Sequence, residues 1–403
     1  MLHNSCDPLT KMKNSVIVLL FLVCAGGLNA QTSRFWGQLT QGDYEIGYQD
    51  TILFNSSQPY ELNGYEGPKP YFVNIWFPIV NETGKRIKYK EYLSMDSIPE
   101  IQALIDSIQK VQYNSFIKWG VTYDLDMWKN SSFNSAKQDL ARAILEENLN
   151  VFKTNQFPKE QFPTIIYHHG NGGISFENSV LFEFLASHGY VIISADYHWP
   201  GLRLNSYTHK SDLSLEDVDF ITRFSESLPF TIHQNLKFIG HSWGGGVALR
   251  LNQKGNSKVK HYIIFDSTIE KSGLLEFKDL YPHFDSLFRN HPYDFKTKST
   301  VITARASYYS DGKIIIQPYP EFLPYQLLDK NEFTFITLKQ ILNHGSFTSV
   351  EVMRAAFLDQ FQQSDSETVR DQFDTYQFLI QLTKDLLDGT ELNEDKILIQ
   401  KNN

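Results

Sequence analysis

The chain has 403 residues and a formal net charge of −9, and 41% of its residues are hydrophobic while 21% are charged. This composition is that of a globular protein with enough apolar residues for a sizeable core, in one large domain or two average ones. The acidic balance and the lack of a basic run in the body of the chain argue against a nucleic-acid partner, because phosphate binding depends on clustered Lys and Arg.

The first thirty residues have the order of a secretory signal peptide. Two lysines precede an apolar run at 16–23, and small residues follow that run up to Ala30. The run is too short to span a membrane, so it is typical of a cleavable leader. We therefore predict a signal peptide over residues 1–30, a single mature domain over residues 31–403, and a secreted or periplasmic location.

Cysteine chemistry is excluded from this mature chain. Both cysteines, Cys6 and Cys24, lie in the predicted leader, so disulfides, thiol nucleophiles and cysteine-type metal sites are not expected. The adjacent His168 and His169 do not form a metal pair by this pattern, because neighbouring residues on a strand point to opposite faces and no carboxylate cluster lies nearby. We expect neither a metal nor another cofactor.

The mature chain opens with strand patterns and then becomes helical. Residues 43–48 and 71–78 are rich in aromatic and β-branched residues, which predicts two antiparallel strands at the start of a sheet. Apolar residues at helical spacing follow at 98–111 and again at 136–148. We therefore predict a helical insertion over about 85–155.

From residue 162 to residue 350, strand and helix patterns alternate. Continuous apolar runs joined by helices indicate an α/β fold whose mostly parallel sheet has helices on both faces. Ligands then bind beyond the carboxyl ends of the strands. The expected strands are 164–167, 190–195, 236–239, 262–265, 300–303 and 333–336, and the expected helices are 177–188, 214–227, 346–361 and 367–388.

One short motif points to chemistry. The sequence Gly240-His241-Ser242-Trp243-Gly244 follows an apolar strand directly and leads into a helical pattern. In that strand–turn–helix context the serine has a strained backbone and projects its hydroxyl above the sheet, as a nucleophile does. The alternative is a glycine-rich turn with an idle serine. The context favours Ser242 as the nucleophile.

A nucleophilic serine needs a base and an acid, which follow it along the chain in the order acid, then histidine. His344 follows the last predicted strand and is the only histidine downstream of His291. Asp266 directly follows the strand after the motif, and Asp311 follows the next strand by eight residues. We favour Asp266, because an ion beside apolar residues at a strand end needs a partner, whereas Asp311 lies in a Ser-Asp-Gly turn.

The tetrahedral intermediate of acyl transfer also needs hydrogen-bond donors for its oxyanion. The backbone N–H of Trp243, the residue after the serine, is one candidate. The glycine-rich loop 168–173 follows an earlier strand and leaves backbone N–H groups available, and Asn171 is our second candidate. We expect the large side chain of Trp243 to shape a pocket.

These residues resemble the α/β-hydrolase fold, and within it the platelet-activating-factor acetylhydrolase group and neighbouring dienelactone-hydrolase-like esterases. The shared motifs are "TIIYHHGNGG", "EFLASHGYVIISADYH", "GHSWGG" and "IIFD". The likeness covers most of residues 40–350. It implies Ser242, Asp266 and His344 as a catalytic triad, with Asn171 and Trp243 as backbone donors. The stretch between the aspartate and the histidine is longer than in the family, so the acetylhydrolase substrate does not carry over.

We therefore predict an exported serine hydrolase that cleaves carboxylic esters, with short acyl groups implied by the resemblance alone. The substrate would be a small-molecule, lipid or acylated-sugar ester, and a membrane contact of the insertion stays open. A serine peptidase or amidase on the same fold is the first alternative, although a free amine terminus would need acidic anchors and the sequence shows no paired-glutamate signal. A non-catalytic binding protein on a hydrolase scaffold is the second.

Overall fold

The computed structural model describes residues 32–62, 64–80, 85–127, 129–197, 210–256, 258–266, 297–304, 307–310, 313–316, 333–340 and 342–400. The predicted leader, residues 1–30, and the alternative acid Asp311 both lie outside the described residues.

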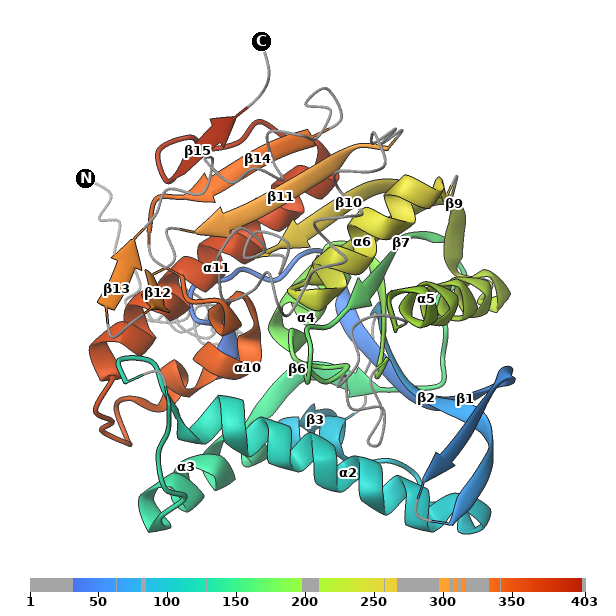
Figure 1. Cartoon of the computed structure of the whole chain (residues 1–403), viewed down its shortest axis with the longest axis horizontal. Helices are drawn as coiled ribbons and strands as arrows, with labels where there is room; N and C mark the ends of the chain where they lie inside the picture. The colour runs from blue at the N-terminus through green and yellow to red at the C-terminus, as the bar shows by residue number, and fades with distance from the viewer. Residues whose placement is uncertain are drawn as a thin grey trace, which may run out of the picture.

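A single large sheet organises the described part of the chain (Figure 1). Its eleven strands lie in the order β15-β14-β11-β10-β9-β7-β8-β2-β1-β6-β3. From β8 to β14 each neighbouring pair is parallel, whereas β2 joins this block antiparallel. The strands are β1 (Glu45–Leu62), β2 (Tyr65–Ile79), β3 (Arg86–Lys88), β6 (Asn148–Lys153), β7 (Phe162–His168), β8 (Val191–Ala195), β9 (Thr231–His241), β10 (Val259–Phe265), β11 (Ser299–Ala304), β14 (Phe333–Leu338) and β15 (Ile397–Gln400).

Helices cover both faces of the sheet. Successive side chains of a strand point to opposite faces, so Ile165 of β7 packs in a cluster with α4 and α11, and Ile166 packs in a second cluster with α5 and α6. None of the described helices is long and apolar enough to cross a membrane. The helices are α2 (Gln102–Phe116), α3 (Ser135–Glu146), α4 (Ser179–Ser187), α5 (Lys210–Ser227), α6 (Trp243–Lys254), α10 (Ser349–Val352) and α11 (Ser366–Asp388).

Shorter elements complete the description. Two small hairpins lie outside the main sheet, β4 (Tyr123–Asp124) with β5 (Lys129–Asn130) and β12 (Ser307–Ser310) with β13 (Lys313–Ile316). One turn of π-helix, η4 (Ile117–Thr122), follows α2 directly. The 3-10 turns are η1 (Arg34–Trp36), η2 (Tyr89–Leu93), η3 (Pro99–Ile101), η7 (Gly345–Phe347) and η8 (Met353–Phe357).

The predicted α/β class with a mostly parallel sheet is confirmed. The two opening strands pair antiparallel, with Tyr48 opposite Trp76. The six apolar runs expected as strands are β7, β8, β9, β10, β11 and β14. Because the parallel strands point the same way, their carboxyl ends open onto one edge of the sheet, where the loops carrying the candidate residues meet.

Two regions differ from expectation. The segment at about 85–155 contains helices α2 and α3, and α2 packs against residues of β1 and β2, but the segment also contributes β3 and β6 to the sheet (Figure 1). Strand β6 pairs with β1, and its four central residues are buried while its two end residues are exposed. The single helix expected at 346–361 is instead a series of short turns.

A hydrogen bond to a distant segment accompanies the break in that helix. Thr348 has an extended backbone, with φ −121° and ψ 149°. The N–H of Val350 then donates to the carbonyl oxygen of Glu177 at 3.0 Å instead of closing a helical turn. A long-range hydrogen bond therefore replaces a local one, and it ties this segment to the loop that follows β7.

Candidate active site

The sheet topology brings the predicted site residues to one edge. The glycine-rich loop follows β7, Ser242 follows β9, and Asp266 follows β10. These three strands are neighbours in the sheet. Strand β14, which precedes His344, is separated from β10 by β11 alone. Residues from 168 to 344 in the chain thus meet beyond the carboxyl ends of parallel strands.

Ser242 sits on a sharp turn between β9 and α6. Its φ is 54° and its ψ is −114°, a conformation that non-glycine residues rarely adopt. Close backbone contacts require the flanking glycines: a Cβ on Gly240 would collide with the carbonyl of Gly244, and one on Gly244 would collide with the carbonyl of His168. The strand–turn–helix geometry is that of a nucleophile elbow.

Ser242, His344 and Asp266 form one hydrogen-bonded chain. The Nε2 atom of His344 lies 2.8 Å from the Oγ atom of Ser242, and its Nδ1 atom is hydrogen-bonded to the carboxylate of Asp266. Asp266 is fully buried, while the His344 side chain is 32% exposed. With Nδ1 donating to the carboxylate, Nε2 is free of its proton and can accept the one on the serine hydroxyl.

The backbone at Asp266 is also unusual. Ser242 and Asp266, with φ of 37°, are the two non-glycine residues with positive φ among those that the structure describes. Such conformations cost of order 1–3 kcal/mol each and persist where the surroundings hold them. The Asp266 N–H donates to the carbonyl of Ile302 at 3.0 Å, which fixes this turn against β11.

The two candidate oxyanion donors flank the serine. The loop that carries Asn171 packs closely on the elbow: a Cβ added to Gly170 would lie only 3.1 Å from the Cβ of Ser242. Trp243 is the first residue of α6, so its N–H belongs to the helix N-terminus, where partial positive charge favours an anion. Its side chain is 1% exposed and packs in the core cluster with α5. It does not line the cavity beside Ser242, so the expectation that it shapes a pocket is wrong.

A cavity of about 210 Å³ adjoins the serine. An engineered cavity of about 150 Å³ holds one benzene ring, so this space suits a small acyl or aryl group. Its lining comes from the insertion, the glycine-rich loop, the elbow and the segment after β14. The lining residues are Trp119, Tyr123, Gly170, Asn171, Gly173, Glu177, His241, Ser242, Asn343, His344, Gly345, Thr348, Val350 and Glu351.

A second histidine–carboxylate pair lies beside the first. The Nδ1 atom of His241 is 3.3 Å from Oε1 of Glu177, and its Nε2 atom donates to the carbonyl oxygen of His344 at 3.0 Å. The same carboxylate oxygen accepts hydrogen bonds from the Tyr167 hydroxyl at 2.8 Å and from the Gly170 N–H at 3.2 Å. Glu177 thus connects the glycine-rich loop, the elbow and, through His241, the loop of His344.

The two groups of this second pair favour each other's charged forms. Burial opposes the charge of both groups, but the mutual hydrogen bond and the opposite charges prevail. The pKa of His241 is raised and the pKa of Glu177 is lowered as a result. Because both nitrogens of His241 donate, the geometry and the charge agree on an imidazolium.

The sequence reasoning missed Glu177, His241 and Glu351. His241 lies inside the motif itself, Glu351 interrupts the apolar run of "SVEVM", and Glu177 precedes the apolar run "VLF" with Asn178 and Ser179 between them. Charged residues in such surroundings are rarely buried without a partner, so this interruption was a usable signal. It does not say which partner each glutamate has.

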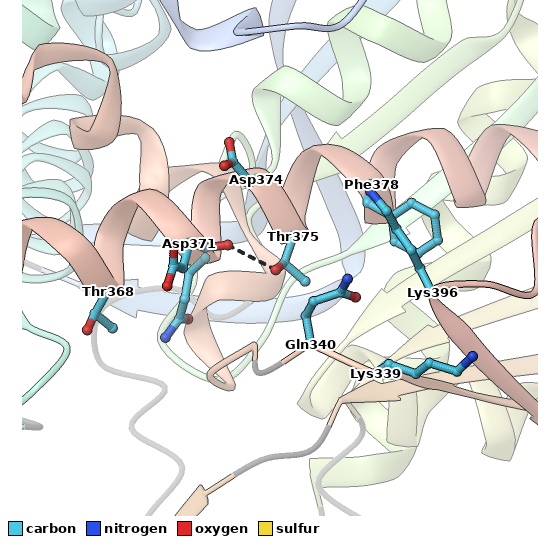
Figure 2. A pocket seen from close by; sticks show the side chains of 9 residues that line it. Lys339, Gln340, Thr368, Asp371, Asp374, Thr375, Phe378 and Lys396 are labelled. Carbon is cyan, nitrogen blue, oxygen red and sulfur yellow. Dashed lines mark hydrogen bonds between the residues drawn. The ribbon is translucent and has the colours of Figure 1, made fainter.

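A second hollow lies away from the serine. It runs along α11 beside β14 and β15, where Figure 2 shows Lys339, Asp371, Phe378 and Lys396 around it. Its lining includes neither histidine nor a serine, and its lysines are engaged: Lys339 donates to two backbone carbonyls and Lys396 lies over the Phe378 ring. The residues that line this second hollow do not include the nucleophile and base that acyl transfer needs. Within the described ranges, no group of His, Cys, Asp and Glu could hold a metal.

Comparisons with known proteins agree with this architecture. A family model described as "alpha/beta hydrolase fold" matches residues 163–299. The chain has the α/β-hydrolase fold. It is similar to the solved structure of a ferulic acid esterase from Streptomyces cinnamoneus, with a TM-score of 0.52 and 15% identity over 89% of this chain and 97% of that one.

Two further solved structures are more distant. An esterase from Pyrobaculum calidifontis has a TM-score of 0.40 and 12% identity over 81% of this chain and 85% of that one. A putative dipeptidyl aminopeptidase IV from Bacteroides ovatus has a TM-score of 0.37 and 11% identity over 65% and 28%. Among the curated proteins there is no significant match. At these identities the likeness concerns the fold.

Proposed function

We propose that this α/β-hydrolase-fold protein is a serine hydrolase that cleaves carboxylic esters through an acyl-enzyme. The observation that carries the proposal is the hydrogen-bonded chain from Ser242 through His344 to Asp266, on a nucleophile elbow that opens into a cavity. A serine, a base and an orienting acid in this geometry are the parts that nucleophilic acyl transfer requires.

Each residue has a distinct part in the reaction. Ser242 Oγ attacks the ester carbonyl as His344 Nε2 takes its proton, and Asp266 stabilises the imidazolium. The N–H groups of Asn171 and Trp243 bind the oxyanion. The imidazolium then protonates the departing alcohol, which leaves an acyl-serine. Water, deprotonated by His344, attacks that acyl group, and the acid leaves as Ser242 regains its proton.

The size of the cavity supports a short acyl group. The space of about 210 Å³ is lined partly by the aromatic side chains Trp119 and Tyr123. The motifs "TIIYHHGNGG" and "GHSWGG" resemble those of the platelet-activating-factor acetylhydrolase and dienelactone-hydrolase-like esterases, and this resemblance supports the same choice. We include in the proposal a small-molecule, lipid or acylated-sugar ester as substrate.

Export through the leader at 1–30 is a further part of the proposal. It rests on the order of basic, apolar and small residues in that leader. Intact mass of the protein recovered outside the cytoplasm tests it: we expect a chain that begins at residue 31, and a chain that keeps the leader would contradict export.

A hydrolysis panel tests the activity. We expect the wild type to cleave p-nitrophenyl esters with a preference for short acyl chains, and acetylated sugars extend the panel to natural alcohols. Ser242→Ala is the control, and equal activity of the two proteins would overturn the assignment. Labelling by a fluorophosphonate probe at Ser242 gives an independent readout. Faster cleavage of matched p-nitroanilides than of the esters would favour an amidase or peptidase.

A further inference from the structure

One buried carboxylate at the cavity forms no ion pair among the described residues, and the charges of Arg354 and His241 act on it only from a greater distance. Glu351 of α10 is 2% exposed and lines the cavity beside Ser242. Within the described part of the chain, no cationic side chain lies at ion-pair distance from it. Three other buried carboxylates in this part of the molecule each contact a basic group: Asp266 contacts His344, Glu177 contacts His241, and Asp365 contacts Arg354.

The hydrogen bonds of Glu351 are incomplete. Its Oε2 atom accepts a bond from the Ser346 hydroxyl at 2.8 Å. The described residues donate no hydrogen bond to Oε1, which lies against the Cα atom of Gly345, where an added Cβ would collide with it. A glycine next to His344 therefore gives the carboxylate room at the cavity wall. An oxygen at the cavity wall that has no protein donor is open to a donor from a ligand in the cavity.

Glu183 shows what a purely structural buried glutamate looks like in this molecule. It is 1% exposed, and both of its carboxylate oxygens are satisfied, by Trp36 Nε1 at 2.8 Å and by the Tyr92 hydroxyl at 2.9 Å. It does not line the cavity. Burial raises the pKa of both Glu183 and Glu351 to about 7. The difference lies in the open oxygen of Glu351 and its place at the cavity.

The same cavity offers an aromatic surface. Trp119 and Tyr123 both line it, with ring centroids 5.2 Å apart at an interplanar angle of 59°. Aromatic faces attract cations, and the Lys118 ammonium already lies 4.1 Å from the centroid of the Trp119 ring. Burial and the charge of Glu351 together raise the pKa of Tyr123 to about 12. The aromatic wall and the carboxylate therefore share one electrostatic environment.

We propose that this cavity binds an ammonium group of the substrate, with Glu351 as its counter-ion and Trp119 and Tyr123 as its aromatic wall. The inference rests on the proposed ester hydrolysis at Ser242 and narrows its substrates to esters that carry a positive charge. An ammonium group supplies both the hydrogen-bond donor and the charge that Glu351 lacks. The charge belongs to the acyl part or to the alcohol part of the ester, and both have the same chemistry at Glu351.

Two matched substrate pairs test the inference and separate the two parts. L-Alanine p-nitrophenyl ester and p-nitrophenyl isobutyrate differ in the acyl part, where a methyl group replaces the ammonium. Acetylcholine and 3,3-dimethylbutyl acetate differ in the alcohol part, where carbon replaces the charged nitrogen. For each pair we measure the ratio of kcat/KM, charged over neutral, in the wild type, Glu351→Gln and Glu183→Gln. Comparing ratios between proteins cancels the intrinsic reactivity of the esters.

We expect the ratio for at least one pair to fall about ten- to a hundredfold in Glu351→Gln. The alanine ester loses a charge-assisted hydrogen bond, whereas acetylcholine, whose trimethylammonium has no N–H, loses the attraction of opposite charges alone. Glu183→Gln, the matched control for loss of a buried carboxylate, should keep the wild-type ratio. Equal ratios in the wild type and Glu351→Gln for both pairs would overturn the inference while leaving ester hydrolysis intact. Absence of Ser242-dependent cleavage of all four esters would remove both proposals.

A measurement on the wild type alone covers the case in which Glu351→Gln does not fold. n-Butylammonium and n-pentanol have nearly the same length and differ in charge. With p-nitrophenyl acetate as the substrate, we expect n-butylammonium to inhibit at a concentration at least about tenfold lower. Equal inhibition by the two compounds would contradict an ammonium site.

Discussion

Two histidine–carboxylate pairs lie side by side in this protein, with the rings of His344 and His241 at a centroid distance of 5.1 Å. His344 is 32% exposed, and its second nitrogen meets the hydroxyl of Ser242. His241 is 6% exposed, and its second nitrogen meets a backbone carbonyl. The same two functional groups therefore have different third partners and different access to the cavity.

The different third partners of His344 and His241 give the two histidines different roles, proton transfer for His344 and positioning for His241. A hydroxyl can give up its proton to an imidazole, whereas a carbonyl oxygen has none to give. His344 can therefore act as a base, and His241 can only hold the chain at His344 in place. Chemistry at one pair depends on the geometry that the other pair fixes, since small displacements of reacting groups are costly in rate.

The largest effect on kcat should come from breaking the Asp266–His344 pair. Asp266→Asn removes the charge that orients His344 and stabilises its imidazolium, so we expect kcat to fall about 10⁴-fold with the fold preserved. Steady-state kinetics on a short-chain p-nitrophenyl ester and circular dichroism measure the two properties. A loss of less than tenfold would mean that another residue, such as Asp311, serves as the acid.

Breaking the Glu177–His241 pair should lower kcat less. Glu177→Gln leaves His241 without its counter-ion and weakens the hold on Gly170, so we expect kcat to fall about ten- to a hundredfold with little change in KM. Glu183→Gln is the control, because it removes an equally buried carboxylate away from the site, and its kcat should stay within about twofold. Equal losses in both variants would indicate general destabilisation instead of positioning.

Gly170 lies between the two pairs and gives a finer test. A Cβ at this position would lie 3.1 Å from both the Nδ1 atom of His241 and the Cβ of Ser242. These contacts are tight enough to shift the loop by a few tenths of an ångström. We therefore expect Gly170→Ala to lower kcat severalfold, to about tenfold. Unchanged kcat would show that the loop adapts without moving the oxyanion donors.

The smallest effect concerns pH. The pKa of His241 is raised from 6.5, so the stabilisation it receives is complete below about pH 6.5 and is lost as the pH rises through its folded-state pKa. The pKa of Glu177 is lowered from 4.5, so its contribution is complete above about pH 4.5 and is lost as the pH falls through its folded-state pKa. The pair therefore stabilises the fold most between these two values.

Urea unfolding of the wild type and Glu177→Gln measures this dependence. The difference in free energy of unfolding should be greatest near about pH 5.5 and smaller by about 1 kcal/mol or more once His241 loses its proton in alkaline solution. A difference that is the same from acidic to alkaline pH would mean that Glu177 and His241 do not form a charged pair.

The sequence predicted local structure better than contacts between distant segments. Apolar runs identified the six parallel strands, and the glycines around Ser242 identified its turn, because both depend on neighbouring residues. The short strands β6 and β15 escaped prediction, since six and four residues are too few to show a clear period. The helix expected at 346–361 is broken by a hydrogen bond to Glu177, which lies more than 170 residues away and leaves no local trace.

The candidate site divides in the same way. Position along the chain, together with the order serine, acid, histidine, was enough to select Ser242, Asp266 and His344, which the structure brings into contact. Their catalytic roles, and those of Asn171 and Trp243, remain predictions. Glu177 and Glu351 were not predicted, because the partner of a buried charge is decided by folding, and a single sequence shows only that the charge interrupts an apolar segment.

The backbone carbonyl of Glu177 has a consequence for how this site can change over generations. It accepts hydrogen bonds from the Val350 N–H at 3.0 Å and the Ser349 hydroxyl at 2.9 Å. The first of these bonds joins main chain to main chain, so every amino acid at position 177 except one that distorts the backbone preserves it. Mutation can therefore exchange the acidic side chain, and with it the polarity of the cavity wall, while the loop of His344 stays attached to the loop of Asn171. A substitution at this position therefore costs rate through the lost pair with His241, while the main-chain attachment of the two loops survives.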